Sequence, residues 1–317
     1  MQRRQFLAAA AATPLAGGLS VGAVQAASHE GAGVLPVARR FSVGGITVTA
    51  VSDGFLPIDA SVLNGIEEAE FQEALTAAYI DGEVHPTGVN AYVIETGDRR
   101  VLVDAGTGTA MGPGLGQLGA NLAATGIEPG SVDAIVATHL HPDHVGGAVN
   151  ESGAVFPNAE LIVSQADLDF WTDEAISSGA PQAVRPFFEL AQAAVDLYSD
   201  RLSVVSGEAD LGGGLTAVPM PGHTPGHIGV MVESDGKQLL IWGDVIHVGA
   251  VQFARPEVTI AFDTDQAQAA ETRARVFDMA VTDRLMVAGM HVDFPGMGHL
   301  EQAGDGVRWI AAGFPYG

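Results

Sequence analysis

The 317-residue sequence contains no cysteine and a single lysine, Lys237. The absence of cysteine excludes disulfide bonds, cysteine-ligated zinc sites and thiol nucleophiles, so oxygen and nitrogen groups must carry any chemistry. Basic residues are scarce, and 14 of them against 38 acidic residues give a net charge of 14 − 38 = −24. Because a surface this negative repels phosphate backbones, we do not expect nucleic acid as a partner or substrate.

Aromatic residues are also few, at 6% of the chain. Hydrophobic residues nevertheless make up 47%, which is ample for a large core.

The N-terminus has the pattern of an export signal. Arg3 and Arg4 form a twin-arginine pair ahead of an alanine-rich run, and Pro14 and Gly17 make that run a poor membrane-spanning helix. We therefore expect residues 1–27 to be a signal peptide, cleaved after residue 26 or 27, with no stable membrane anchor. The mature protein is expected to be periplasmic or secreted, with a linker at 28–38 and a single domain at 39–317.

Strand and helix patterns alternate along this domain. Gly44-Gly45 suits a tight turn between strands at 41–43 and 46–51, and a second hairpin is predicted within 90–103. Further strands are predicted at 134–137, 161–163, 202–205, 215–218, 228–233, 238–242 and 285–288. Helices are predicted at 67–80, 117–125, 165–176, 183–198 and 265–280.

A cluster of potential metal ligands follows the strand predicted at 134–137. His139, His141, Asp143 and His144 lie within six residues there, whereas solvated loops favour Gly, Asn, Ser and Lys. Neutral imidazole nitrogens and carboxylate oxygens are the donors that zinc and its neighbours prefer. We interpret the cluster as a metal site.

Other predicted strands also end in donor residues. His223 lies in a rigid Pro/Gly turn, and Asp244 and His291 each follow a buried strand. This convergence from rigid elements is what a metal site requires. Asp104 also ends a strand, where it is either a turn or cap residue or an acceptor that orients a ligand.

The order of these residues resembles the metallo-β-lactamase fold superfamily over residues 41–299. Within it, the segments 161–171, 222–227, 251–253 and 294–299 are most similar to methyl parathion hydrolases and related lactonases. The resemblance implies an α/β (α+β) fold, an αββα sandwich of two mixed sheets flanked by helices, with two metal ions in the cleft between the sheet edges.

Carried over by position, the resemblance implies two ligand sets. His139, His141 and His223 would bind one ion, Asp143, His144 and His291 the other, and Asp244 would bridge both. Zinc is the default metal, and manganese, cobalt and iron are alternatives. Two such ions lower the pKa of a shared water to about 7, which makes a bridging hydroxide available as nucleophile. Asp143 and Asp244 are the candidate catalytic residues, placed to orient it.

Some relatives are disfavoured by single positions. Asp244 argues against true β-lactamases, which have Cys or Ser there, and His141 argues against the flavin-linked di-iron branch, which has Glu. The few basic residues argue against a glutathione thioesterase.

The substrate pocket is expected to be apolar. The aromatic residues of the two predicted helices at 165–198 suit either core packing or a pocket lining, and the resemblance favours the lining. The predicted substrate-binding residues are Met111, Phe170, Trp171, Phe187, Phe188, His247, Ile260 and Phe262. Departures from methyl parathion hydrolases at Met111, His247, Ile260 and Phe262 favour lactones or aryl esters over phosphotriesters.

The sequence therefore predicts an exported dinuclear metal hydrolase that opens small apolar lactones or aryl esters, with organophosphate triester hydrolysis as a side activity. The alternatives are organophosphorus hydrolysis as the main activity and a lactone-binding module without catalysis. A homodimer is expected by resemblance alone. His227 is expected to be a structural hydrogen-bonding residue, and His85 and His299 ordinary surface or loop residues.

Overall fold

The computed structural model describes residues 37–97, 99–112 and 114–313. The predicted signal peptide and most of the predicted linker lie outside the described residues. Within the described part, no helix combines the length and the apolar character needed to cross a membrane.

The first large sheet is built mainly from the N-terminal half of the chain. Antiparallel pairing joins its first four strands in spatial order, and parallel pairing joins the remaining ones. Its strands, in spatial order, are β1 (Ala38–Val43), β2 (Ile46–Ile58), β4 (His85–Glu95), β5 (Arg100–Val103), β6 (Ala134–Val136), β9 (Glu160–Ser164) and β10 (Leu202–Val205). The predicted turn between β1 and β2 is present, with Gly44 at a φ of 57° that suits glycine.

The second large sheet is built from the C-terminal half and is antiparallel except where β14 pairs with β16. Its strands, in spatial order, are β11 (Ala209–Gly212), β12 (Leu215–Pro219), β13 (Ile228–Ser234), β14 (Lys237–Ile241), β16 (Met286–Ala288), β17 (Met297–Ala303) and β18 (Gly306–Ala311). Two small sheets pair β3 (Leu63–Asn64) with β15 (Thr259–Ile260), and β7 (Val149–Asn150) with β8 (Gly153–Ala154).

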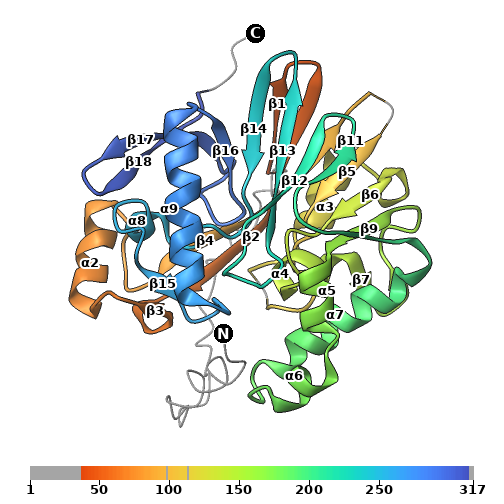
Figure 1. Ribbon diagram of the computed structural model, residues 1–317, viewed down its shortest axis with the longest axis horizontal. Helices are drawn as coiled ribbons and strands as arrows, with labels where there is room; N and C mark the ends of the chain where they lie inside the picture. The colour runs from red at the N-terminus through yellow and green to blue at the C-terminus, as the bar shows by residue number, and fades with distance from the viewer. Residues whose placement is uncertain (1–36, 98, 113, 314–317) are drawn as a thin grey trace, which may run out of the picture.

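Helices cover the outer faces of both large sheets, as Figure 1 shows. The α-helices are α2 (Glu68–Ala77), α3 (Leu118–Ala124), α4 (Pro142–Val145), α5 (Gln165–Trp171), α6 (Glu174–Gly179), α7 (Arg185–Leu197), α8 (Gly249–Gln252) and α9 (Gln266–Thr282). Short 3₁₀ turns are η1 (Ala60–Val62), η2 (Pro129–Ser131), η3 (Gly146–Ala148) and η4 (Ser199–Arg201).

The core between the sheets confirms the predicted αββα sandwich. Val48 and Val103 of the first sheet belong to the same buried cluster as Val230 and Ile241 of the second. One further apolar layer packs α3, α5 and α7 on the first sheet, and another packs α9 on the second. Burial of these layers is the dominant stabilising contribution.

The fold differs from the sequence prediction in several places: β2 and β4 are longer than predicted, and β11 and the short strands and helix α8 were not predicted. The helix predicted at 165–176 is broken into α5 and α6, because the side chain of Asp173 accepts hydrogen bonds from Ala175 N and Ile176 N and starts a new helix. The C-terminal hairpin of β17 and β18 was not predicted, since much of it is exposed and its polar residues hide the alternation of a strand.

Candidate metal centre

The histidine cluster directly follows β6 of the first sheet, as predicted. β6 ends at Val136, and α4 begins at Pro142, the residue type favoured in a first helical turn. His141 precedes this helix, while Asp143 and His144 lie inside it. A buried strand and a short helix therefore fix both ends of the cluster.

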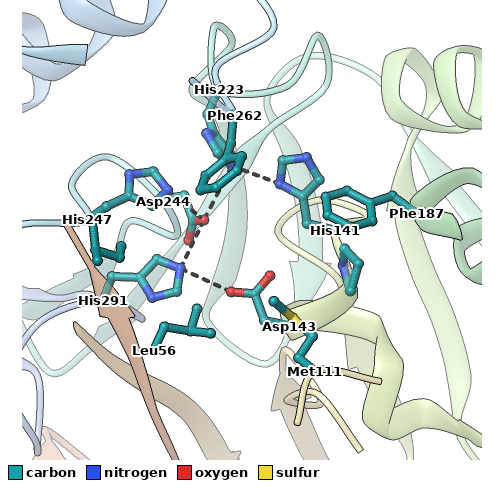
Figure 2. Close-up of a pocket in the computed structure, with 12 residues that line it drawn as sticks. Leu56, Met111, His141, Asp143, Phe187, His223, Asp244, His247, Phe262 and His291 are labelled. Atoms are coloured by element: carbon teal, nitrogen blue, oxygen red, sulfur yellow. Dashed lines mark hydrogen bonds and ion pairs between the residues drawn. The ribbon is translucent and has the colours of Figure 1, made fainter. Parts of the chain in front are cut away.

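The remaining predicted ligands come from the second sheet. His223 lies in the connection between β12 and β13, Asp244 follows β14, and His291 follows β16. All of these side chains are buried, and they face the cluster from the first sheet. Figure 2 shows His223, Asp244 and His291 turned toward His141 and Asp143.

One donor group contains three imidazoles. His141 Nδ1 lies 2.9 Å from His139 Nε2 and 2.9 Å from His223 Nε2. The carboxylate oxygen Asp244 Oδ2 completes the group, at 3.6 Å from His139 Nε2 and 3.3 Å from His223 Nε2. These four donor atoms lie close enough to surround a single cation.

A second donor group lies on the other side of Asp244. Asp143 Oδ2 lies 3.4 Å from His144 Nε2 and 3.3 Å from His291 Nε2. Asp244 Oδ2 also approaches these two nitrogens, at 3.3 and 3.1 Å. The structure thus brings together both predicted ligand sets, with Asp244 between them.

His247 joins this arrangement at its edge. Its Nε2 lies 3.2 Å from Asp244 Oδ2, and with Asp244 and His291 it forms a third possible donor group. Its ring faces the hollow, where the sequence analysis placed it as a substrate-binding residue.

Unpartnered buried atoms show that the donor set fits a cation. His144 Nε2 and Asp244 Oδ1 are buried without a hydrogen-bond partner among the described residues. Buried polar atoms normally have partners, so exceptions at converging donors are what an ion would satisfy. The charge state of the first group suits this, because burial lowers the pKa of His139 and His141 well below the usual histidine value and keeps their lone pairs free.

The second group pairs ionised carboxylates with imidazoles whose pKa values the carboxylates raise. Burial alone would raise the pKa of Asp143 and Asp244, but the nearby imidazole of His144 and that of His291 hold both well below the usual range. Burial alone would lower the pKa of His291, but the two carboxylates outweigh it and raise the pKa to about 10. Both carboxylates therefore remain ionised, and a metal ion that binds here would displace the proton from the His291 ring.

Hydrogen bonds from behind orient several ligands. His144 Nδ1 lies 2.7 Å from Asp104 Oδ2, and His291 Nδ1 donates to the carbonyl of Gly88 at 2.8 Å. Asp104 thus has the orienting geometry that was one of the two interpretations of its position.

The remaining histidines have structural roles. His227 donates from Nδ1 to the Met220 carbonyl at 2.8 Å and accepts from Asp244 N at 2.9 Å, which confirms a structural rather than a ligand role. The expectation for His85 was wrong. It is 4% exposed, and its Nδ1 lies 2.8 Å from Thr87 Oγ1.

The hollow above the donors has an apolar wall. Its cavity volume is about 60 Å³, below the roughly 300–1,000 Å³ of drug-sized sites, and it opens to solvent. Apart from the donor residues, it is lined by Leu56, Ile58, Met111, Pro142, Phe187, His247 and Phe262. None of the described residues that line it is lysine or arginine.

The structure places Met111, Phe187, His247 and Phe262 in this wall, as the sequence analysis expected, but not the other predicted substrate-binding residues. Trp171 and Phe188 are 2% and 0% exposed and belong to the core under the first sheet, with Phe170 packed against them. Ile260 is buried in the cluster around α2. Successive residues of a helix point about 100° apart, so adjacent Phe187 and Phe188 face the pocket and the core respectively.

Leu56, Ile58 and Pro142 line the pocket and were missed. Leu56 and Ile58 lie two residues apart on β2 and so share one face, the signal that could have identified them.

A buried carboxylate holds the loop that brings Met111 to the pocket. Asp53 lies at a bulge in β2 and accepts hydrogen bonds from the main-chain nitrogens of Thr107, Gly116 and Leu118, at 2.9–3.1 Å, and from the Thr107 hydroxyl at 2.6 Å. Asp53 therefore fixes both ends of this loop to the first sheet.

Replacing Asp53 with alanine is expected to destabilise the fold by about 3 kcal/mol, because it leaves several buried hydrogen-bond donors without an acceptor. Urea unfolding measures the loss. Asp59→Ala is a matched control, since Asp59 is an exposed cap of η1 and its loss costs about 1 kcal/mol. Equal losses in the two variants would contradict a special role for Asp53.

Comparison with known families and curated proteins gives a consistent result. The family model of the metallo-beta-lactamase superfamily matches residues 85–291, which include all the donor residues above. YobT, an uncharacterized protein of Bacillus subtilis, is 28% identical over 179 residues, which are 53% of this chain and 69% of that protein. The N-acyl homoserine lactonase AttM of Azorhizobium caulinodans is 33% identical over 120 residues, and the match spans 36% of this chain and 41% of that protein.

Solved structures match nearly the whole described chain. The hydrolase AbOPH, described as in the beta lactamase superfamily, has a TM-score of 0.84 at 31% identity, covering 88% of this chain and 99% of that one. AidC, a dizinc quorum-quenching lactonase, has a TM-score of 0.83 at 22% identity with the same coverage, which shows the shared fold.

Proposed function

Because the chain belongs to the metallo-beta-lactamase superfamily, we propose that it is a dinuclear metal-dependent hydrolase of lactones or aryl esters, with weaker activity on organophosphate triesters. The observation that carries the proposal is the convergence of seven donor side chains at the bottom of an apolar hollow. The donors are His139, His141, Asp143, His144, His223, Asp244 and His291.

We assign one ion to each donor group, with Asp244 shared. Zinc suits these donors, and manganese, cobalt or iron are the alternatives. When bound, such ions supply Lewis acidity and an activated water near neutral pH. The carboxylates of Asp143 and Asp244 are the hydrogen-bond acceptors that the protein supplies between the two donor groups. They orient a water that attacks a substrate lying above them.

The pocket wall selects the substrate by its charge and polarity. It offers apolar contacts from residues such as Leu56, Met111 and Phe187, and its described residues include no lysine or arginine to pair with a substrate carboxylate or phosphate. A second anionic group that lies against this wall, away from the donors, would lose its hydration without a compensating contact. Neutral lactones, aryl esters and triesters are therefore favoured over β-lactam acids and phosphate monoesters.

The names of similar proteins agree with this choice of chemistry. AttM is named an N-acyl homoserine lactonase and AidC a quorum-quenching lactonase that was solved with N-hexanoyl-L-homoserine as product. We accordingly include N-acyl homoserine lactones among the candidate substrates. AttM aligns over less than half of its own length, so the lactone assignment remains a proposal for this chain.

A substrate panel on zinc-loaded protein tests the proposal. Dihydrocoumarin, N-hexanoyl homoserine lactone, phenyl acetate and methyl paraoxon would be assayed beside His139→Ala as the inactive control. We expect lactone or aryl ester turnover well above the control and slower paraoxon turnover. Faster paraoxon turnover would replace the proposal with an organophosphorus hydrolase, and lactone binding without turnover would replace it with a binding module.

The wall residue Phe187 provides a sharper test of substrate contact. Removing its ring by Phe187→Ala is expected to raise KM for dihydrocoumarin about 10-fold with little change in kcat, because apolar contacts to bound substrate also persist in the transition state. Phe55→Ala is the matched control, since that phenyl group is 52% exposed and does not line the pocket. A wild-type KM in Phe187→Ala would remove this helix from the substrate site.

Cellular location and assembly complete the proposal. We propose export by the twin-arginine route and a homodimer in solution. Export is tested with the Arg3→Lys/Arg4→Lys variant, which is expected to stay in the cytoplasm. The dimer is tested by light scattering of the mature protein.

A further inference from the structure

A second buried carboxylate, Asp263, lies behind the ligand His223. Its side chain is fully buried, and Asp263 Oδ1 lies 2.8 Å from His223 Nδ1. Its other oxygen accepts a hydrogen bond from Ile260 N at 3.0 Å. Both carboxylate oxygens therefore have a partner, and the carboxylate faces the imidazole nitrogen that points away from the donor group.

This hydrogen bond determines what His223 can do. With Nδ1 donating to Asp263, the neutral ring carries its lone pair on Nε2, which faces His141 Nδ1 at 2.9 Å and Asp244 Oδ2 at 3.3 Å. A carboxylate that fixes the tautomer of an imidazole in this way also makes the imidazole a stronger ligand.

The chain around Asp263 is bonded to the same turn by its backbone. Thr264 N and Thr264 Oγ1 each donate to the His223 carbonyl at 2.8 Å, and Asp265 N donates to Gly222 O at 2.9 Å. Phe262, the preceding residue, lines the pocket. The segment 260–265 thus approaches His223 through both its backbone and its side chain.

We propose that Asp263 is a positioning residue for His223 and sets the affinity of one of the two ions. Asp104 has the corresponding place behind His144, at 2.7 Å, so each donor group contains one imidazole backed by a buried carboxylate. Asp263 serves the group of His139, His141 and His223, whereas Asp104 serves the group of Asp143, His144 and His291. The inference rests on the metal loading proposed above but not on the substrate.

The test is metal binding by Asp263→Asn. An asparagine side chain offers one acceptor oxygen where Asp263 uses two, so either His223 Nδ1 or Ile260 N loses its acceptor. Starting from metal-free protein, zinc would be titrated in competition with a chromophoric chelator, and the cobalt-loaded spectrum would be recorded. We expect the affinity for one ion to fall about 10–100-fold while the other ion binds as in the wild type.

Two comparisons make the assignment specific. Asp104→Asn is expected to weaken the other ion, so the double variant weakens both. Asp265→Asn is a matched control two residues away, because Asp265 caps α9 and its side chain does not contact a donor. Phe262→Ala, in the same segment, is expected to leave zinc affinity unchanged.

The proposal is overturned if Asp263→Asn binds both ions with wild-type affinity, or if it weakens both ions equally. Circular dichroism of the metal-free proteins separates misfolding from loss of metal affinity. If Asp263→Asn does not fold, Asp263→Ser, which is smaller and admits water, is measured with the same two criteria. Every readout here is metal binding, which does not depend on the substrate. A protein that fails the lactone panel can therefore still confirm or contradict the role of Asp263.

Discussion

Asparagine in place of Asp244 is expected to lower kcat/KM on dihydrocoumarin by about 10³-fold or more. Asp244 Oδ2 lies within 3.1–3.6 Å of five imidazole nitrogens, from His139, His144, His223, His247 and His291. An amide cannot supply the negative charge that both donor groups share, so we expect weaker binding of both ions.

Metal content after dialysis at a defined free zinc concentration measures this loss beside the kinetics. Asp235→Asn is the control, because it makes the same chemical change in the exposed hairpin between β13 and β14. Full zinc content with full activity in Asp244→Asn would show that Asp244 does not bridge the groups. Full zinc content with lost activity would assign Asp244 to water orientation alone.

Truncating Trp171 to alanine is expected to destabilise the protein by about 3–5 kcal/mol, because it opens a large cavity in the core. Trp171 is 2% exposed, and its ring packs on Phe188 with centroids 4.6 Å apart and edge-on to His141 at 5.2 Å. Urea unfolding of metal-free protein measures the loss without a contribution from bound ions.

A milder replacement at the same position checks the cause. Trp171→Phe retains an aromatic ring and removes an indole N–H that has no partner among the described residues, so it is expected to cost under about 2 kcal/mol. The expected contrast is with Phe187→Ala, which changes KM far more than stability. A raised KM at unchanged stability in Trp171→Ala would instead place this ring in the substrate site.

The sequence was sufficient for the donors but not for the pocket wall. His139, His141, Asp143 and His144 are adjacent in the chain, and the donors of the second sheet follow recognisable buried strands, so local pattern and resemblance locate them. The identity of the residues that line the pocket wall depends on which side of each helix faces the pocket. That orientation is set by packing across elements, which is why Phe187 and Phe188 have different environments.

The supporting carboxylates illustrate the same limit. Asp104 ends a buried strand, a signal visible in the sequence, whereas no local pattern distinguishes Asp53 from Asp59 or Asp263 from Asp265. Asp263 is 40 positions from His223, and only the folded chain shows that they touch. The contact between Asp263 and His223 depends on the path of the chain between β15 and α9. The spacing of the two residues in the sequence does not reveal that path.

The origin of the donors in two different sheets has a consequence for durability. Bound ions would join residues 139–144 of one half of the sandwich to residues 223–291 of the other, as a reversible cross-link does. At a free zinc concentration 1,000 times Kd, one such ion adds about 4 kcal/mol to the folded state. The two halves would then unfold together, and the heat tolerance of the protein would follow the zinc content of its surroundings.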